Sequence, residues 1–465
     1  MYFKPYYLGC LAHASYLIGG DNGVGAVIDP RRDVHEYIAD AKAAGLAIKY
    51  VVETHLHADF VSGHMELLKR TGATIHIGAA TSVSFPHIAV REGDTITMGD
   101  VRLGFLETPG HTPEGISVVV NVGDEVEPRM VFTGDTLFIG DVGRPDLAGW
   151  RGHSANEMAH AMYRSLKDKL LTLPDSTEVW PAHGAGSACG RALSDDRVST
   201  LGHEKQFDPA LKHVIAGNEE AFVRELMEGQ SAIPPYFSHD VTANRTGPDL
   251  MDDVRSRGSA LTPNAVEALS ENGVIVLDTR ESDEFGAGHV PGAINIGLDG
   301  KFAPWVGNVI DPGTPLIVVS AAGQEEEVVT RLGRVGYEQV VGWLDGGMDR
   351  WTRAGGETTR LAQVTPDALR GMYADGLRPH LLDVRTDEEW EHGHIDGALH
   401  VPLNALEARM REIPDEPTLV LCGSGYRSSI ACSLLQRQGR RDISNVVGGW
   451  AAWISSEASL GHVRA

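Results

Sequence analysis

The second half of the chain contains an internal repeat of about 100 residues, the length of a small domain. Leu277–Arg280 in the first copy recurs as Leu382–Arg385 in the second, and Gly288–Ala293 recurs as Gly393–Ala398. Each copy alternates apolar, strand-like runs with amphipathic helical stretches, which is typical of an α/β domain. A repeat of this length is too long for a solenoid unit, so it indicates a tandem duplication of one domain.

The residues before the repeat also alternate short β-rich runs with helical stretches. Examples of these runs are Ala26–Asp29, Ile48–Val52 and Met130–Thr133, and each leads into a polar loop. Such an alternation predicts an α/β fold whose functional loops gather at strand ends. The pattern predicts four segments, which are a first domain over residues 1–240, a polar linker over 241–258, and the two copies over 259–357 and 362–458.

Charge and cysteine content narrow the class of partner. The formal net charge is -24, which disfavours binding to nucleic acid and to anionic membranes. Four cysteines are too few for a disulfide framework in a chain of 465 residues. The first residues lack the charged start and apolar core of a signal peptide, and no apolar run reaches the roughly 20 residues of a membrane span. We therefore expect a cytoplasmic protein with reduced cysteines.

Four separated segments of the first domain are rich in the side chains that bind metals. They are Thr54–Asp59, Thr108–Thr112, Phe132–Thr136 and Pro181–Gly184. Each contains His or Asp and each follows an apolar run, so all four are expected where strands end. A lone loop histidine is more often a surface residue than a ligand, but four ordered segments favour a metal centre.

These segments, in this order, resemble the metallo-β-lactamase family, and most closely its persulfide dioxygenase branch, which is similar to glyoxalase II but binds one iron. The resemblance implies an αββα sandwich with one Fe(II) per chain, held by His55, His111 and Asp135. Two imidazoles and one carboxylate form the facial triad of non-haem iron oxygenases. In the two-metal hydrolases of this family a histidine follows the Thr54–Asp59 motif, and here that residue is Phe60. A phenyl ring cannot ligate a metal, which favours a single-metal site.

The remaining polar residues of the motifs then need other roles. His57, Asp59 and His183 are expected to hydrogen-bond the ligands or a metal-bound water. The alternative for these three is a residual second metal site of lower affinity. Arg144 follows Asp135 closely, and the resemblance implies that its guanidinium binds a carboxylate of the thiol substrate. Cys189 could hold or relay sulfane sulfur, or could be an inert buried thiol.

The last domain carries a second reactive motif. An apolar strand ends at Cys422, a short Gly-containing loop follows, and a helix is predicted to start near Ser428. Backbone N–H groups of such a loop and the positive end of the helix stabilise a thiolate. Arg427 adds a positive charge for an anionic sulfur donor. The loop and the repeated motifs around it resemble rhodanese, which implies that Cys422 and Arg427 are catalytic.

The first copy of the repeat lacks these two residues. Its matching loop carries Ser320 at the Cys422 position and Glu325 at the Arg427 position. A serine hydroxyl is a far weaker nucleophile than a thiolate, and a carboxylate repels thiosulfate or sulfite. We therefore expect an inactive rhodanese-like domain. The shared polar residues of the two copies are expected to maintain the fold; they are Asp278, His289, Asp383 and His394.

Together the resemblances imply an iron-dependent persulfide dioxygenase and sulfurtransferase that acts in sulfide detoxification. Its substrates would be O2 and a low-molecular-weight thiol persulfide, and its products would include sulfite or thiosulfate. Self-association into a homo-oligomer is also implied. Two alternatives stay open, a two-metal thioester hydrolase like glyoxalase II and a non-catalytic sulfur relay. The sequence leaves open the identity of the thiol and the direction of the rhodanese reaction.

Overall fold

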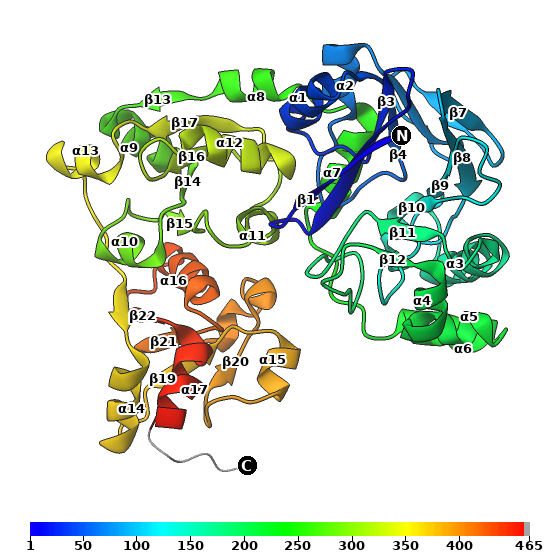
Figure 1. The fold of residues 1–465 in the computed structure, drawn as a ribbon. Helices are drawn as coiled ribbons and strands as arrows, with labels where there is room; N and C mark the ends of the chain where they lie inside the picture. Colours follow the sequence, from blue (N-terminus) through cyan, green and yellow to red (C-terminus); the bar gives the residue numbers. More distant parts are fainter. Residues whose placement is uncertain (460–465) are drawn as a thin grey trace. The chain divides into compact units, whose positions relative to one another are not determined.

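The computed structural model describes residues 1–459 and divides into two compact units. Met1–Asp253 together with Gly333–Gly336 form the first unit, and Val254–Leu332 with the chain from Tyr337 onward form the second. Figure 1 shows that helices and strands alternate along nearly the whole chain, as the sequence predicts.

The first unit is built on two six-stranded sheets. In the first sheet the strands follow chain order; they are β1 (Tyr2–Leu8), β2 (His13–Gly19), β3 (Val24–Ile28), β4 (Ala47–Glu53), β5 (Thr74–Gly78) and β6 (Ile88–Val90). In the second sheet the spatial order runs from β12 back to β7; the strands are β7 (Thr95–Met98), β8 (Val101–Glu107), β9 (Ile116–Val122), β10 (Met130–Gly134), β11 (Glu178–Pro181) and β12 (Ser199–Thr200).

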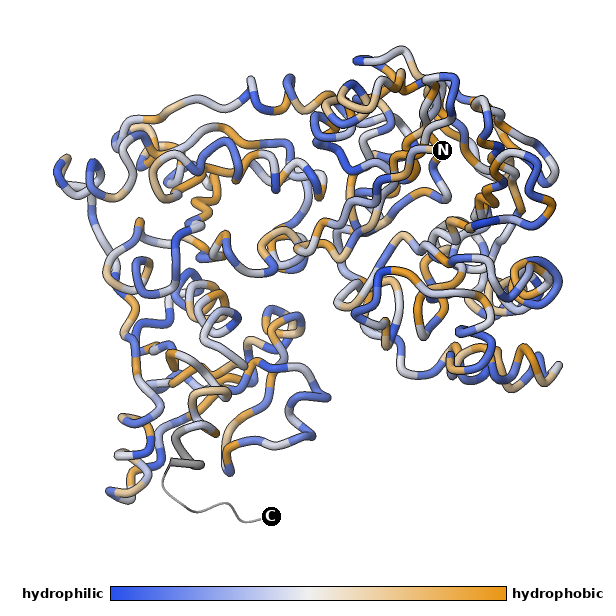
Figure 2. The backbone as a smooth tube through the Cα atoms, in the orientation of Figure 1, coloured by the Kyte–Doolittle hydropathy of each residue, from blue (hydrophilic) through white to orange (hydrophobic). Residues whose placement is uncertain are grey.

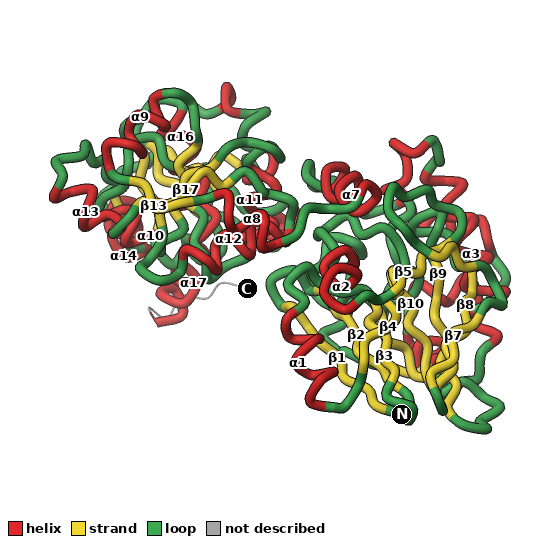
Figure 3. The backbone as a smooth tube through the Cα atoms, turned by 90° about the horizontal axis from the view of Figure 1, so that it is seen from above, coloured by secondary structure: helices red, strands yellow, loops and turns green. Residues whose placement is uncertain are grey.

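One hydrophobic core lies between these sheets and two more lie on their outer faces. Ile28 and Val52 of the first sheet pack with Phe105 and Phe132 of the second. Figure 2 shows hydrophobic stretches following the strands, and Figure 3 shows the sheets side by side with α1 and α2 on one side and α3 on the other. Helices cover the outer faces, which gives the αββα order that the sequence predicts.

The helices of this unit are short, and four of them begin after a glycine or a polar capping residue. They are α1 (His35–Ala43), α2 (His64–Thr71), α3 (Ala155–Asp168), α4 (Leu201–Phe207), α5 (Lys212–Ile215), α6 (Glu219–Met227), α7 (Phe237–Thr246) and α8 (Met251–Arg257), the last of which crosses into the second unit. The longest, α3, starts with a capping box in which Ser154 and Glu157 satisfy each other's backbone N–H groups.

The segment predicted as a linker, residues 241–258, is helical over most of its length. It holds the second half of α7 and all of α8. Val241 and Asn244 of α7 are buried, and the side chain of Asn244 donates to the carbonyl oxygens of His57 and Phe60. The polar composition that suggested a linker therefore includes a residue that fixes the motif loop.

The second unit contains two five-stranded sheets. The strands within each sheet are parallel, and both sheets have the same strand order. The first consists of β13 (Ser259–Leu261), β17 (Val340–Leu344), β16 (Leu316–Val319), β14 (Ile275–Asp278) and β15 (Ile294–Asn295). The second consists of β18 (Ala362–Val364), β22 (Ile443–Val446), β21 (Thr418–Leu421), β19 (His380–Asp383) and β20 (Leu399–His400). This identity of order confirms the tandem duplication.

Each sheet of the second unit carries its own helices. The first copy has α9 (Pro263–Glu271), α10 (Ser282–Ala287), α11 (Phe302–Val309), α12 (Glu325–Arg334) and α13 (Gly347–Arg353). The second has α14 (Pro366–Ala374), α15 (Asp387–Glu391), α16 (Tyr426–Arg437) and α17 (Gly449–Ser459). Within residues 1–459, none of the helices combines the length and apolar content that a membrane crossing requires.

Candidate metal centre and cysteine loop

Three residues predicted as metal ligands lie together at the strand ends of the first unit. His55 follows β4, Asp135 follows β10, and His111 lies in the loop between β8 and β9. The Oδ2 atom of Asp135 is 3.7 Å from Nε2 of His55 and 3.3 Å from Nε2 of His111. All three side chains are buried, and their ligand atoms lie within 4.8 Å of one another.

The free atoms of this cluster fit a cation. Nε2 of His55 and Oδ2 of Asp135 are buried without a hydrogen-bond partner. Buried polar groups are almost always satisfied, so a bound cation explains this pair better than an empty space. Burial lowers the pKa of His55 well below its ordinary value and also lowers the pKa of His111, which keeps both rings neutral and able to donate a lone pair. Burial opposes the charge on Asp135, but the neighbouring ring of His183 holds the pKa of this carboxyl well below the ordinary range.

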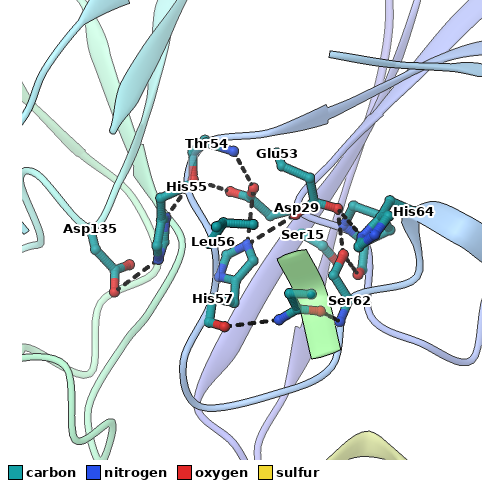
Figure 4. Close-up of polar contacts among 12 residues, drawn as sticks. Ser15, Asp29, Glu53, Thr54, His55, Leu56, His57, Ser62, His64 and Asp135 are labelled. Atoms are coloured by element: carbon teal, nitrogen blue, oxygen red, sulfur yellow. Dashed lines mark hydrogen bonds and ion pairs between the residues drawn. The ribbon is translucent and has the colours of Figure 1, made fainter. Parts of the chain in front are cut away.

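The other ring nitrogens of the two histidines are held by hydrogen bonds. Nδ1 of His111 donates to the carbonyl oxygen of Arg144 at 2.9 Å. Nδ1 of His55 lies 2.9 Å from the hydroxyl of Thr54, which itself donates to Asp29. Because the outer nitrogens carry the protons, both Nε2 atoms present lone pairs to the same point. Figure 4 shows the chain of contacts from Asp29 through Thr54 to His55.

His57 is the next histidine of the motif, but its ring is turned away from the place where the three predicted ligand atoms meet. Its Nε2 lies 3.2 Å from Oδ1 of Asp29 and 3.3 Å from Oε2 of Glu53. Burial opposes protonation, yet the two carboxylates raise the pKa of His57 to about 10. The ring of Phe60 packs against His57 with centroids 4.4 Å apart. His57 therefore contacts carboxylates behind the cluster, where the sequence analysis expected it to contact the ligands or a metal-bound water (Figure 4).

Asp59 and His183 form a second contact chain beside the cluster. Nδ1 of His183 is 2.8 Å from Oδ1 of Asp135, and its Nε2 is 2.9 Å from Oδ2 of Asp59. His183 thus bridges a predicted ligand and a carboxylate, an arrangement suited to orienting Asp135. Asp59 and His183 also lie with Cys189 in a group that could hold an ion of its own.

Arg144, which the sequence analysis predicted to bind a substrate carboxylate, lies buried beside Asp146. Its side chain is 1% exposed, and its guanidinium makes a paired interaction with Asp146 at 2.7 and 2.8 Å. The remaining N–H groups donate to Ala188 and Ser231. The carboxylate that this guanidinium contacts is its neighbour two residues along the chain, and binding of a substrate carboxylate by Arg144 stays a prediction. Arg144 contributes to the cluster through its backbone carbonyl.

Cys189 is buried beside Asp59 and His183. Burial raises the pKa of its thiol well above the ordinary value, with the nearby carboxylates adding to the shift. A protonated thiol is a poor nucleophile. The relay role for Cys189 stays a prediction.

The loop after β21 surrounds the thiol of Cys422. The backbone N–H of Gly425 donates to Sγ at 3.1 Å, and the hydroxyl of Ser428 lies 3.3 Å from it. Helix α16 begins at Tyr426 directly after Gly425, whose φ of +100° suits a glycine. The helix terminus and the inward N–H favour a negative sulfur, as the sequence analysis expected.

Arg427 is not a free positive charge. Its guanidinium makes two 2.6 Å hydrogen bonds to the carboxylate of Glu389. Hydrogen bonds from Arg427 are the main cause that lowers the pKa of Glu389 to about 2. Glu389, in α15, therefore balances the positive charge that Arg427 brings beside Cys422, and the catalytic role of Arg427 stays a prediction.

Comparison with known proteins follows the same division of the chain. The family described as "Metallo-beta-lactamase superfamily" matches residues 8–183. A solved metallo-beta-lactamase structure from Staphylococcus aureus subsp. aureus COL is 31% identical with a TM-score of 0.66, covering 74% of this chain and 98% of that chain. The chain belongs to the metallo-β-lactamase superfamily. The family described as "Rhodanese-like domain" matches residues 262–354 and 365–456, so two rhodanese-like domains follow the metallo-β-lactamase domain.

Two kinds of curated relative resemble the metallo-β-lactamase domain. The persulfide dioxygenase ETHE1 of Mus musculus is 31% identical over 199 residues, which are 42% of this chain and 70% of that protein. The cytoplasmic hydroxyacylglutathione hydrolase of Arabidopsis thaliana is 37% identical over 185 residues, which are 39% of this chain and 67% of that protein. Relatives within the same superfamily therefore have two different activities, and the residues of the site have to indicate whether this chain resembles the dioxygenase or the hydrolase in function.

Sequence reasoning missed the buried carboxylates behind the cluster. Asp29 ends an apolar run and adopts a φ of +48°, which is unusual for a residue other than glycine. Glu53 is the last residue of β4 and directly precedes the motif. A carboxylate at the end of an otherwise apolar strand was the available signal, because an unpaired charge is rarely buried there.

Proposed function

We propose that the protein is a single-metal persulfide dioxygenase that also transfers sulfane sulfur through Cys422. Similarity to a persulfide dioxygenase, together with two rhodanese-like domains, supports a function in sulfur metabolism. In the overall reaction, a thiol persulfide, O2 and water yield the thiol, sulfite and two protons.

The observation that carries the proposal is the position of His57. In a two-metal site this residue would face the metals, but here Asp29 and Glu53 hold its ring and Phe60 packs against it. Without His57, the ligand atoms of His55, His111 and Asp135 still lie together, as one of three groups among the described residues that could hold an ion. Two imidazoles and a carboxylate suit Fe(II), which when bound would supply open coordination positions for O2 and a sulfur ligand.

The residues around the cluster have defined tasks in this proposal. Thr54 and the carbonyl of Arg144 orient the rings of His55 and His111. His183 holds one oxygen of Asp135, so that the other oxygen faces the ligand point. The ligand side chains are almost fully buried, which limits access of bulk water to a reactive persulfide.

The second reaction proceeds at Cys422. Its thiolate attacks the terminal sulfur of a persulfide R–S–SH, the bond between the two sulfurs of the donor breaks, and R–S⁻ leaves. The product is a Cys422 persulfide, which can pass its sulfur to sulfite to form thiosulfate. Gly425 and Ser428 stabilise the negative sulfur during both steps.

Substitution of one predicted ligand tests the metal centre. Asp135→Ala should lower bound iron from about one atom per chain to a trace and remove persulfide-dependent O2 uptake, because two imidazoles alone hold Fe(II) weakly. Asp124→Ala changes an exposed aspartate of the same domain and should keep both. Elemental analysis and an oxygen electrode measure the two properties. Full O2 uptake by Asp135→Ala would remove this residue from the ligand set.

A thioester hydrolase is the second candidate function, because the hydroxyacylglutathione hydrolase shares the higher identity. The group of Asp59, His183 and Cys189 is where a second ion would bind in that case. Near two metals per chain, with hydrolysis of a glutathione thioester, would favour the hydrolase. One metal with no thioester hydrolysis would favour the dioxygenase. A non-catalytic sulfur relay instead predicts persulfidation of Cys422 without any O2 uptake.

A further inference from the structure

A cavity of about 700 Å³ lies against the loop that carries Cys422, and both copies of the repeat line it. The active copy contributes Tyr426 and Arg427 of the loop itself. The first copy contributes Asp299, Lys301 and Trp305, among others. The first copy, which has a serine at the matching loop position, therefore forms part of the cavity beside the Cys422 loop.

The loop is attached to the first copy by Tyr426. Its hydroxyl donates to the carbonyl oxygen of Gly297 at 2.7 Å. Its ring packs so closely on Gly300 that a Cβ atom there would lie 2.5 Å from the ring. A side chain at position 300 would displace the ring, so the two copies are closely fitted at this point.

The helix that follows the loop is attached by Asn295 of β15. Oδ1 of Asn295 accepts a hydrogen bond from Ser429 at 2.5 Å, and its backbone N–H donates to Ser433 at 3.0 Å. All three residues are buried. The amide nitrogen of Asn295 donates to the carbonyls of Asp278 and Arg280, which fixes the direction of Oδ1. The interface between the two copies is thus held together by buried hydrogen bonds.

The charges of the cavity differ from those of a site for inorganic anions. Arg427 is neutralised by Glu389, and the other charged lining residues are Glu281, Asp299 and Lys301. Two carboxylates against one ammonium disfavour the doubly negative thiosulfate and favour a positive group on the donor. The indole of Trp305 adds an aromatic face, which also attracts cations.

We propose that the first copy forms one side of the donor-binding site of the second copy. There, Glu281, Asp299 and Trp305 select a thiol persulfide that carries an ammonium group over thiosulfate. This inference rests on the proposed sulfur transfer through Cys422. The transfer step is unchanged: the Cys422 thiolate takes the terminal sulfur and the thiolate of the donor leaves. The residues of the first copy affect only which donor binds near the thiol.

The test compares three donors in single-turnover reactions of the full chain without O2, which stops the dioxygenase reaction. The donors are thiosulfate, cysteine persulfide and N-acetylcysteine persulfide, the last two differing by the ammonium group. Mass spectrometry gives the rate of persulfidation at Cys422. The double variant Glu281→Gln with Asp299→Asn is compared with Glu271→Gln plus Asp311→Asn, which removes the same charge from exposed positions of the same copy.

The native protein should prefer cysteine persulfide over both other donors. In the cavity variant the preference over thiosulfate should fall about tenfold, because repulsion of the dianion is relieved. The preference over N-acetylcysteine persulfide should fall as well, and the control pair should keep both. Trp305→Leu should raise the concentration of cysteine persulfide at half-maximal rate. Unchanged donor ratios in the cavity variant, with Cys422 still reacting, would overturn only the proposal that the first copy selects the donor. No persulfidation of Cys422 by any donor in the native protein would overturn the proposed sulfur transfer as well.

Discussion

The two rhodanese-like copies keep the same scaffold in matching detail. Asp278 pairs with Arg280 in the first copy as Asp383 pairs with Arg385 in the second, each within a buried strand end. The shared histidines each stack on an aromatic ring four residues earlier; the pairs are Phe285 with His289 at 3.7 Å and Trp390 with His394 at 3.8 Å. These contacts maintain the fold in a copy with a nucleophile and in one without.

The copies differ where the loop meets the helix. The backbone N–H of Gly425 donates to the sulfur of Cys422, whereas the first copy has Ser320 at the matching strand end. Helix α12 begins at Glu325, where the second copy has Arg427. The difference shows that one fold carries two different loops, and that the first copy still contacts the Cys422 loop through the carbonyl oxygen of Gly297.

The largest expected effect follows from removing the nucleophile. Cys422→Ser should lower sulfur transfer by about a thousandfold or more, since a neutral hydroxyl replaces a thiolate. Persulfide-dependent O2 uptake should stay at the native level, because it depends on the other unit. Cys432→Ser, a buried cysteine of α16, is the matched control and should keep sulfur transfer. Loss of O2 uptake in Cys422→Ser would show that the two sites are coupled.

The shared scaffold predicts equal costs in the two copies. Asp278→Ala and Asp383→Ala should each lower the free energy of unfolding by about 3 kcal/mol, because each leaves an arginine that is buried or nearly buried without its carboxylate partner. Urea denaturation followed by circular dichroism measures both variants. A large loss in one copy and none in the other would mean that the two buried pairs are not equivalent.

A smaller effect is expected from changing Glu389, whose carboxylate pairs with the guanidinium of Arg427. Glu389→Gln should raise kcat/KM for thiosulfate severalfold, because Arg427 then presents an uncompensated charge. The pKa of Glu389 is lowered to about 2, so the ion pair is complete above the ordinary glutamate range and is lost only as the pH falls towards 2. The gain should therefore be constant from roughly pH 5 to 9. A decrease at every pH would show that Glu389 is needed to position Arg427.

The smallest effect is expected in the first copy. Ser320→Cys should give no measurable sulfur transfer in a Cys422→Ser background, because Glu325 still stands where the arginine is needed. Thiocyanate formation from thiosulfate and cyanide measures it. Strong activity would show that the charge at position 325 does not matter.

Much of this arrangement could be predicted from sequence, for a physical reason. Strand ends of a layered α/β fold converge, so His55, His111 and Asp135 could be expected to meet once each was found after an apolar run. The repeat likewise predicted two domains, because similar motifs that recur in the same order indicate that each copy has the same fold. Cys422 was recognisable because its loop and helix are contiguous in the chain.

The partners of the polar side chains could not be predicted in the same way. Arg144 pairs with Asp146 only because the loop bends both side chains together, which depends on backbone conformation. His57 turns towards Asp29 and Glu53, and residues 29 and 57 come from different strand ends. Glu389 reaches Arg427 across 38 residues. Contacts that join distant segments carry no local signal in the sequence.

The most direct test of the account is O2 consumption by the iron-loaded protein on adding glutathione persulfide, with sulfite measured in the same sample. The account predicts rapid uptake with one sulfite formed per O2, in the native protein and in Cys422→Ser but not in Asp135→Ala. Absence of uptake with glutathione persulfide and with coenzyme A persulfide, together with hydrolysis of a glutathione thioester by the same sample, would contradict it.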